Sequence, residues 1–192
     1  MLASAFAATP VAGADEFAIR VTDQQLNQVD SRLFGHFLEI ASFGELGPEA
    51  LVDPDTGRLP EEVVQQLKQL RPTVIRFPGG IDIDYLDWTD RIDLPGRPDG
   101  ERRPTSQTRG NTLTNYFGYD EFLELAAELD TQPLLVVNLR RSLEPGADVA
   151  AAAEHAAALV AYCNADVDSE RLTATDKRWA QQRVANGHAK PW

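Results

Sequence analysis

The sequence predicts an α/β fold in which parallel strands are covered by helices. Residues 73–77 and 133–138 are short, continuous apolar segments, which are typical of strands buried on both faces. Segments with apolar residues at helical spacing alternate with them, at residues 60–70, 120–129 and 148–162. This alternation predicts either a (β/α) barrel or an open doubly wound sheet, and the pattern alone leaves both open.

The first half of the chain contributes two expected strands and a helix. A short first strand is expected at residues 17–21 and a bulkier, more aromatic one at residues 33–39, where Gly35 permits close approach of another backbone. Pro60 suits the first turn of the first helix, and Pro72 ends that helix. The buried strand at residues 73–77 follows directly.

In the second half, aspartates mark the expected helix starts. Asp120 can cap the second helix, and Asp148 can cap a third, alanine-rich helix that runs to about Tyr162. Trp179 and Val184 are expected in one more helical turn, which a glycine stops.

Residues 90–115 are polar and rich in proline and glycine. A loop of that length is functional or disordered in most compact domains.

Charge and length exclude several classes of protein. The 192 residues suggest a single domain. The net charge of −12 and the lack of a basic patch argue against nucleic acid or an anionic membrane surface as partners. We expect the pairs Arg102-Arg103 and Arg140-Arg141 to be solvated. No apolar run approaches the roughly 20 residues of a membrane span.

We expect neither a metal nor a cofactor. Cys163, the one cysteine, excludes an intrachain disulfide and Cys-rich zinc sites, and its apolar surroundings predict a buried, inert thiol. Four acidic residues that could ligate calcium do not match the spacing of an EF-hand loop, and alternate residues of an extended segment face opposite ways. They are Asp82, Asp84, Asp87 and Asp90. His155 is expected to be structural.

The N-terminal residues 1–16 are mostly small and apolar. They are expected to form a disordered tail or the remnant of a signal peptide. The second interpretation favours a secreted or periplasmic protein, with a cytoplasmic one as the alternative. Residues 17–192 form the predicted folded part.

Polar residues end three of the expected strands: Glu39, Arg76 and Asn138. In (β/α) barrels and in open α/β sheets, ligands bind at the carboxyl ends of the strands. Glu39 could accept hydrogen bonds from sugar hydroxyls, cap a helix or pair with an arginine. Arg76 could hold a carboxylate in position by a bidentate contact, or form a purely structural ion pair.

Acidic and aromatic residues follow Arg76 at once, after the turn Pro78-Gly79-Gly80. Carboxylates, a guanidinium and flat rings together suit a hydroxyl-rich ligand such as a sugar. Asp82, Trp88 and Asn138 are therefore candidate residues lining the site. Tyr85 and Trp88 could stack on sugar rings, but packing in the core is an equal alternative. The sequence has no Gly-x-Gly-x-x-Gly or Walker pattern, which makes a nucleotide ligand a weak hypothesis.

Six segments in a fixed order carry a family resemblance. They are residues 34–39, 75–80 with Tyr85 and Trp88, 115–122, 137–138, 162–164 and 183–188. Together they resemble the N-terminal part of the α-L-arabinofuranosidases of glycoside hydrolase family fifty-one. Each segment alone is weakly specific, whereas the ordered series is distinctive.

This resemblance implies a (β/α)8 barrel with an added β-sandwich, and an exo-acting enzyme that removes terminal arabinofuranosyl groups from hemicellulose or pectin side chains. The expected partner is an arabinose-containing oligo- or polysaccharide. Members of the family retain configuration by using one glutamate as acid/base and another as nucleophile. By the same resemblance, Glu39 hydrogen-bonds the arabinose ring and Arg76 lies beneath the catalytic carboxylates, where it keeps the nucleophile ionised.

The sequence departs from the family pattern at two points. Ile81 occupies the position after Pro-Gly-Gly where many members carry an asparagine that contacts the sugar. The family's acid/base lies in an Asn-Glu pair, and no such pair occurs in the 192 residues. No catalytic residue is therefore expected in this chain.

A complete barrel takes about 250 residues. We therefore expect an incomplete (β/α)8 TIM barrel with roughly the first three βα units, inactive by itself. A non-catalytic sugar-binding partial barrel and a related glycosidase acting on a β-glucan are the alternatives. Homo-oligomerisation of a longer parent stays open.

Overall fold

The computed structural model describes residues 20–39, 48–53, 55–96, 102, 105–106 and 112–192. The chain divides into two units, residues 1–30 and residues 31–192. The described part of the first unit has neither helix nor strand, so the short strand expected at residues 17–21 is wrong at residues 20–21. Residues 17–19 of that strand and the predicted tail at residues 1–16 lie outside the described residues.

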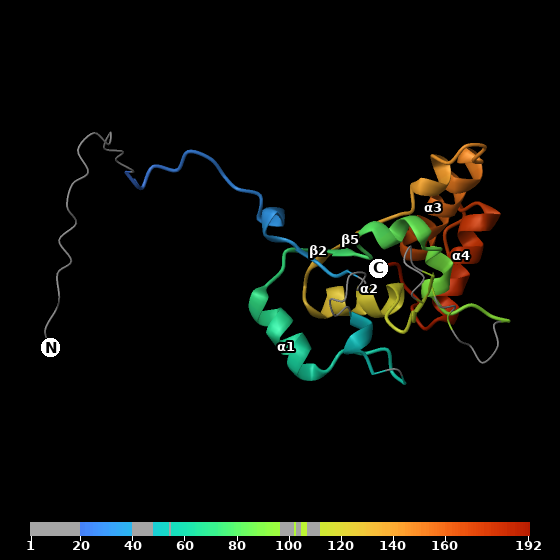
Figure 1. The fold of residues 1–192 in the computed structure, drawn as a ribbon, viewed down its shortest axis with the longest axis horizontal. Coiled ribbons are helices and arrows are strands. Elements are labelled where there is room, and N and C mark those ends of the chain that lie inside the picture. Colours follow the sequence, from blue (N-terminus) through green and yellow to red (C-terminus); the bar gives the residue numbers. More distant parts are fainter. Residues whose placement is uncertain (1–19, 40–47, 54, 97–101, 103–104, 107–111) are drawn as a thin grey trace, which may run out of the picture. The chain divides into compact units, whose positions relative to one another are not determined.

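Three parallel strands form the central sheet of the second unit, of which β2 and β5 are labelled in Figure 1. They are β1 (His36–Phe37), β2 (Val74–Phe77) and β5 (Gln132–Leu135), in the order β1-β2-β5. Arg76 of β2 lies opposite Phe37 on one side and Leu134 on the other. A helix separates consecutive strands along the chain, which confirms the predicted α/β fold with a parallel sheet.

The described residues form four α-helices: α1 (Glu61–Leu70), α2 (Tyr119–Glu128), α3 (Val149–Asn164) and α4 (Ala174–Ala185). No helix among the described residues is long and apolar enough to cross a lipid bilayer. Helix α1 follows Pro60 as predicted, and it ends where Arg71 adopts a left-handed conformation with φ of 49°. Helix α4 has twelve residues, so the single turn expected there is three turns long.

Two of the helix starts test the predicted caps. Asp148 caps α3 as predicted, because its carboxylate accepts a hydrogen bond of 3.0 Å from the amide of Ala151. Asp120 does not cap α2, which begins one residue earlier, after Gly118. Glu121 supplies the capping contact instead, since its carboxylate accepts a hydrogen bond of 2.7 Å from the Gly118 amide.

The first and last strands differ from their predictions. The segment expected as a strand at residues 33–39 begins with a 3-10 helix, η1 (Ser31–Phe34), and only His36–Phe37 is strand. The close approach at Gly35 is confirmed, because a Cβ atom there would lie 2.3 Å from Val74 Cγ1. Strand β5 is largely exposed rather than buried, since no described strand pairs with its outer edge.

The remaining described chain also contains short elements: η2 (Pro48–Ala50), η3 (Ile81–Tyr85), η4 (Trp88–Arg91), η6 (Arg140–Ser142) and the antiparallel pair β3 (Thr105–Ser106) and β4 (Thr112–Leu113). Elements η3 and η4 follow β2, and η6 follows β5. Three 3-10 helices therefore come directly after carboxyl ends of the sheet, where the sequence predicts the site.

Aromatic rings fill the core behind β2. Phe77 is fully buried and stacks on Phe122 with ring centroids 4.7 Å apart, while the ring of Phe117 meets it edge-on at 5.6 Å. Trp88 lies 4.7 Å from Trp179 of α4. Such aromatic pairs contribute about 0.5–1.5 kcal/mol each beyond the burial of their area. The core thus extends from the sheet to the last helix.

Helices α3 and α4 pack side by side at the carboxyl-terminal end of the chain (Figure 1, orange and red). Arg183 of α4 is fully buried and donates hydrogen bonds to the carbonyl oxygens of Tyr162 at 2.8 Å and His188 at 3.1 Å. Cys163 is buried as predicted, and burial, with the nearby charge of Asp120, raises the pKa of its thiol to about 12.

A buried polar cluster joins α2, α3 and the end of α4. The hydroxyl of Tyr162 donates to the carboxylate of Asp120 at 2.7 Å, and the amide of Asn186 donates to the same carboxylate at 3.2 Å. Burial raises the pKa of Asp120, and the two hydrogen bonds oppose that shift. Asp120, which was predicted to cap α2, is therefore the centre of a polar cluster that joins three helices.

We predict that Tyr162→Phe lowers the free energy of unfolding by about 1–3 kcal/mol, because it leaves the buried carboxylate of Asp120 without its best donor. Urea unfolding followed by circular dichroism measures the change. Tyr116→Phe is the matched control, since Tyr116 is exposed, and it should change the free energy by less than about 0.5 kcal/mol. Equal stability of wild type and Tyr162→Phe contradicts the assigned role.

Candidate functional site

The candidate site is centred on an ion pair between Arg76 and Glu39. Pairing of β1 with β2 places Phe37 opposite Arg76, and the amide of Leu38 donates to the carbonyl oxygen of Arg76 at 2.9 Å. Glu39 therefore emerges beside the arginine, and Arg76 Nη2 contacts Glu39 Oε1. Their side chains are 28% and 37% exposed, so solvent or a ligand can reach both.

The guanidinium of Arg76 is held on more than one side. It lies over the ring of Phe37, with its Cζ atom 3.8 Å from the ring centroid. Its Nε atom is buried and has no hydrogen-bond partner in the described part of the chain. The charge of the arginine is therefore oriented mainly by the carboxylate of Glu39.

The turn after β2 runs directly against this ion pair. A Cβ atom on Gly79 would lie 2.6 Å from Glu39 Cγ and 2.7 Å from Arg76 Nη2. Gly80 has φ of 71°, and a Cβ atom there would lie 3.2 Å from Glu39 Oε2. A side chain at position 79 would therefore displace the ion pair, and at position 80 the positive φ favours glycine.

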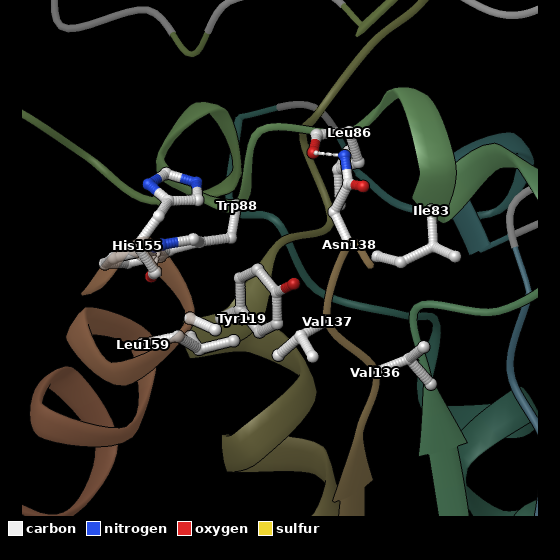
Figure 2. A pocket seen from close by; sticks show the side chains of 10 residues that line it. Ile83, Leu86, Trp88, Tyr119, Val136, Val137, Asn138, His155 and Leu159 are labelled. Atoms are coloured by element: carbon white, nitrogen blue, oxygen red, sulfur yellow. Dashed lines mark hydrogen bonds between the residues drawn. The ribbon is translucent and has the colours of Figure 1, made fainter. Parts of the chain in front are cut away.

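Asn138, the polar residue expected at the end of the third strand, holds the chain that follows β2. Its Nδ2 atom donates to the carbonyl oxygens of Asp84 at 3.0 Å and Leu86 at 3.1 Å, the latter drawn in Figure 2. The side chain therefore ties the carboxyl ends of β2 and β5 together. The side-chain NH2 group of Asn138 therefore makes hydrogen bonds to the backbone in this structure.

A small recess lies beside Asn138, between α3 and the segments that follow β2 and β5 (Figure 2). Leu159 and Tyr119 line it together with Val137. The space open to the centre of a water-sized sphere is about 10 Å³, enough for about one water molecule. The recess is therefore too small for a sugar ring.

Trp88 belongs to the core. Its side chain is only 5% exposed, its indole N–H donates to the carbonyl oxygen of His155 at 2.9 Å, and its ring packs against Trp179. Of the two alternatives for this residue, the contacts favour core packing over stacking on a ligand.

The other aromatic candidate is placed differently, since Tyr85 is 37% exposed and contacts Arg140. Asp82 lies within η3, but its side chain is outside the described residues. Among the described residues, no group of three or more acidic, histidine or cysteine side chains is arranged to hold a metal. The described side chains of Asp84, Asp87 and Asp90 therefore form no such group.

Asp87 is a structural residue at the end of the turn. Its Oδ1 atom accepts from the backbone N–H of Thr89 at 3.0 Å, which caps η4, and lies 3.1 Å from Nε2 of His155. Burial alone raises the pKa of Asp87, but the nearby imidazole of His155 and the hydrogen bonds from Thr89 outweigh it and hold the pKa well below its ordinary range. His155 thus has the structural role predicted for it.

One buried ion pair was not foreseen from sequence. Arg102 makes a bidentate contact with Glu121, at 2.6 and 2.8 Å, and its side chain is only 8% exposed. The prediction that Arg102 is solvated is therefore wrong, and Arg103 lies outside the described residues. The partners are 19 residues apart, and no local pattern signals such a pair.

Comparisons with known proteins identify the family of the chain. The family model described as the alpha-L-arabinofuranosidase 1 domain matches residues 66–192. An intracellular exo-alpha-(1→5)-L-arabinofuranosidase of Bacillus subtilis is 27% identical over 175 residues, which are 88% of this chain and 31% of the relative. Alpha-L-arabinofuranosidase C of Emericella nidulans is 28% identical, over 88% of this chain and 30% of its own length.

Solved structures show the same likeness. The family 51 arabinofuranosidase of Xanthomonas axonopodis superposes with a TM-score of 0.62 at 27% identity, over 86% of this chain and 31% of that one. A family 51 enzyme of Bifidobacterium longum gives the same TM-score and identity, over 85% and 29% of the two chains.

The fold is that of the N-terminal region of these glycoside hydrolases. The chain belongs to the family of α-L-arabinofuranosidases defined by this domain, glycoside hydrolase family 51. It spans about three-tenths of the length of the curated relatives that it matches.

We predict that Asp87→Asn flattens the acid limb of the pH–stability curve. Because the folded-state pKa of Asp87 is depressed, its contribution is fully present above the unfolded pKa of about 3.9 and is lost as the pH falls below that value. The mutant should be less stable than wild type at pH 6, with the gap closing toward pH 2. Urea unfolding at a series of pH values measures this.

Asp168→Asn, an exposed substitution in the loop before α4, serves as the control and should leave the shape of the curve unchanged. A constant difference between Asp87→Asn and wild type from pH 6 to pH 2 would show that the charge of Asp87 does not matter.

Proposed function

We propose that residues 17–192 form the N-terminal portion of the catalytic barrel of a retaining, exo-acting α-L-arabinofuranosidase. The proposed substrates are arabinose-containing oligo- and polysaccharides, from which the enzyme removes terminal arabinofuranosyl groups. The observation that carries the proposal is the Arg76–Glu39 ion pair, which is accessible at the carboxyl ends of adjacent parallel strands. The membership of the chain in an arabinofuranosidase family supports a sugar as the ligand of that pair.

Glu39 would accept hydrogen bonds from hydroxyl groups of the arabinofuranosyl ring. A carboxylate that is partly buried and fixed by an arginine is a strong acceptor, because charge-assisted hydrogen bonds are about twice as strong as neutral ones. Arg76 would orient Glu39 from below and, in a completed barrel, keep a neighbouring catalytic carboxylate ionised by its positive charge.

Asn138 would contribute to the site by holding a neighbouring segment of backbone in place. Its two hydrogen bonds hold the backbone around Tyr85 in place, so that the segment after Gly79-Gly80 forms a fixed wall of the site. Asp82 belongs to the same segment and stays a candidate residue of the site, whereas Trp88 would support this wall from the core. Ile81, 54% exposed on the same segment, would present an apolar surface to the sugar.

We expect Glu39→Ala to lower kcat/KM for an aryl α-L-arabinofuranoside by about 5- to 150-fold, in the assembled enzyme that joins this chain to the barrel units its relatives carry beyond it. That range corresponds to about 1–3 kcal/mol for a lost, partly buried polar contact. Glu170→Ala, an exposed glutamate far along the chain, is the control and should keep wild-type kinetics. An unchanged kcat/KM in Glu39→Ala removes Glu39 from the site.

The 192-residue chain by itself should release no arabinose. Hydrolysis with retention needs two carboxyl groups about 5–5.5 Å apart across the scissile bond, and the sequence lacks the Asn-Glu pair that supplies the acid/base in the family. The purified chain, incubated with an aryl arabinofuranoside, should match the buffer blank. Turnover that survives repurification and disappears in Glu39→Ala would refute this expectation.

A further inference from the structure

The sequence contains a single Asn-Gly pair, Asn186-Gly187, at the end of α4. Asparagine followed by glycine is especially prone to deamidation, because the unhindered amide nitrogen of glycine can attack the side-chain carbonyl carbon of the asparagine. Gly187 is exposed, and a Cβ atom there would meet nothing within 4 Å in the described part of the chain. Water and base therefore reach the peptide bond between the two residues.

Three hydrogen bonds fix the side chain of Asn186 in the folded chain. Its Nδ2 atom donates to Asp120 Oδ2 at 3.2 Å and to the hydroxyl oxygen of Tyr162 at 2.9 Å. Its Oδ1 atom accepts a hydrogen bond of 2.8 Å from Gln182 Nε2. The asparagine that could react is thus part of the polar cluster that joins α2, α3 and α4.

The attacking nitrogen is fixed as well. The amide of Gly187 donates to the carbonyl oxygen of Val184 at 3.0 Å. Ring closure needs this nitrogen to approach Asn186 Cγ, so the glycine must give up its hydrogen bond and the asparagine must rotate out of the cluster. Both changes require the end of α4 to open. Local opening of a helix end takes less free energy than global unfolding, so the reaction would pass through such a minor open state.

The reaction needs water and base only. Solvent base removes the amide proton of Gly187, the nitrogen bonds to Asn186 Cγ, and the Cγ–Nδ2 bond breaks with release of ammonia. Water then opens the cyclic imide at one of its two carbonyl groups, which leaves aspartate or isoaspartate at position 186. The change in charge is one additional carboxylate.

A carboxylate at position 186 does not suit the cluster. It has no N–H group, so Asp120 loses a donor and faces a second negative charge instead. Asp120 is only 5% exposed, and burial already raises its pKa, which shows that these surroundings disfavour even one negative charge. Tyr162 has a single hydroxyl proton and cannot donate to both carboxylates. The native hydrogen bonds therefore cannot all form again.

We propose that Asn186-Gly187 is a deamidation site that the polar cluster protects in the folded chain. Opening of the end of α4 allows the pair to react, and the new carboxylate then keeps the cluster from re-forming. Each chain that reacts becomes less stable and opens more often, so the modification is an irreversible record of local unfolding. This inference does not depend on a sugar ligand.

Mass spectrometry of the tryptic peptide that contains residues 184–192 measures the rate of deamidation at mildly alkaline pH. The rate should be low in the folded chain and much higher in denaturing urea. Tyr162→Phe should raise the rate in the folded chain about 5-fold, which corresponds to about 1 kcal/mol for one lost hydrogen bond. Gln182→Ala, which removes the donor to Asn186 Oδ1, should also raise it.

Asn164 is the internal control, because it is exposed and is followed by alanine rather than glycine. Its rate should be low and equal in wild type and both variants. Deamidation of Asn186 that is as fast in the folded chain as in urea overturns the proposal, since the cluster then gives no protection. An unchanged rate in both Tyr162→Phe and Gln182→Ala overturns it as well.

The effect of the product is tested separately with Asn186→Asp. This variant should unfold at a lower urea concentration than wild type, whereas Asn164→Asp, the matched exposed substitution, should unfold with wild type. Asn186→Asp that fails to fold while Asn164→Asp folds supports the same conclusion. Equal stability of Asn186→Asp and wild type would show that the cluster accepts the new carboxylate, and the proposed irreversible record would be wrong.

Discussion

The alternation of side chains along β2 organises the rest of the structure. Ile75 and Phe77 point into the aromatic core and are buried, whereas Arg76 between them faces the other way and meets Glu39. In a strand, consecutive residues lie on opposite faces, so the core and the candidate site are built from neighbouring positions. A shift of the strand by one residue would place the arginine among the aromatic rings and remove the ion pair.

Parallel pairing extends this arrangement across the sheet. Because all three strands run in the same direction, the segments that follow β1, β2 and β5 come out at one edge. Glu39, Gly79 and Asn138 lie there for that reason alone, although they are far apart in sequence. Asn138 then uses its amide to fix the turn after β2, so that the wall of the site depends on the neighbouring strand.

The sequence predicts the features that depend on neighbouring residues, such as helix ends and buried strands. Pro60 and Pro72 bracket α1, Asp148 caps α3, and the apolar run at residues 73–77 gives β2, since helix ends and buried strands depend on nearby residues. The meeting of Glu39 and Arg76 could also be anticipated, because strand ends in a parallel sheet converge. Their role in binding remains a proposal.

Predictions from neighbouring residues fail where contacts with residues distant in sequence determine the position of a side chain. Asp120 has the composition of a cap, yet Tyr162 and Asn186 draw it into the interior. Arg102 belongs to a polar, proline-rich segment, and its burial depends on ion pairs with Glu121 and Asp93. Trp88 and Tyr85 are three residues apart with the same sequence context, and only the packing of α3 and α4 sends one ring into the core and leaves the other accessible.

The contact between Gly79 and the ion pair has an evolutionary consequence. Any side chain at this position must displace the carboxylate of Glu39 or the guanidinium of Arg76, so the three positions cannot vary independently. A natural homologue with alanine or serine in place of Gly79 should also carry a shorter residue at one of the other two. Such linked substitutions would trace lineages in which the pocket has been reshaped for a different ligand.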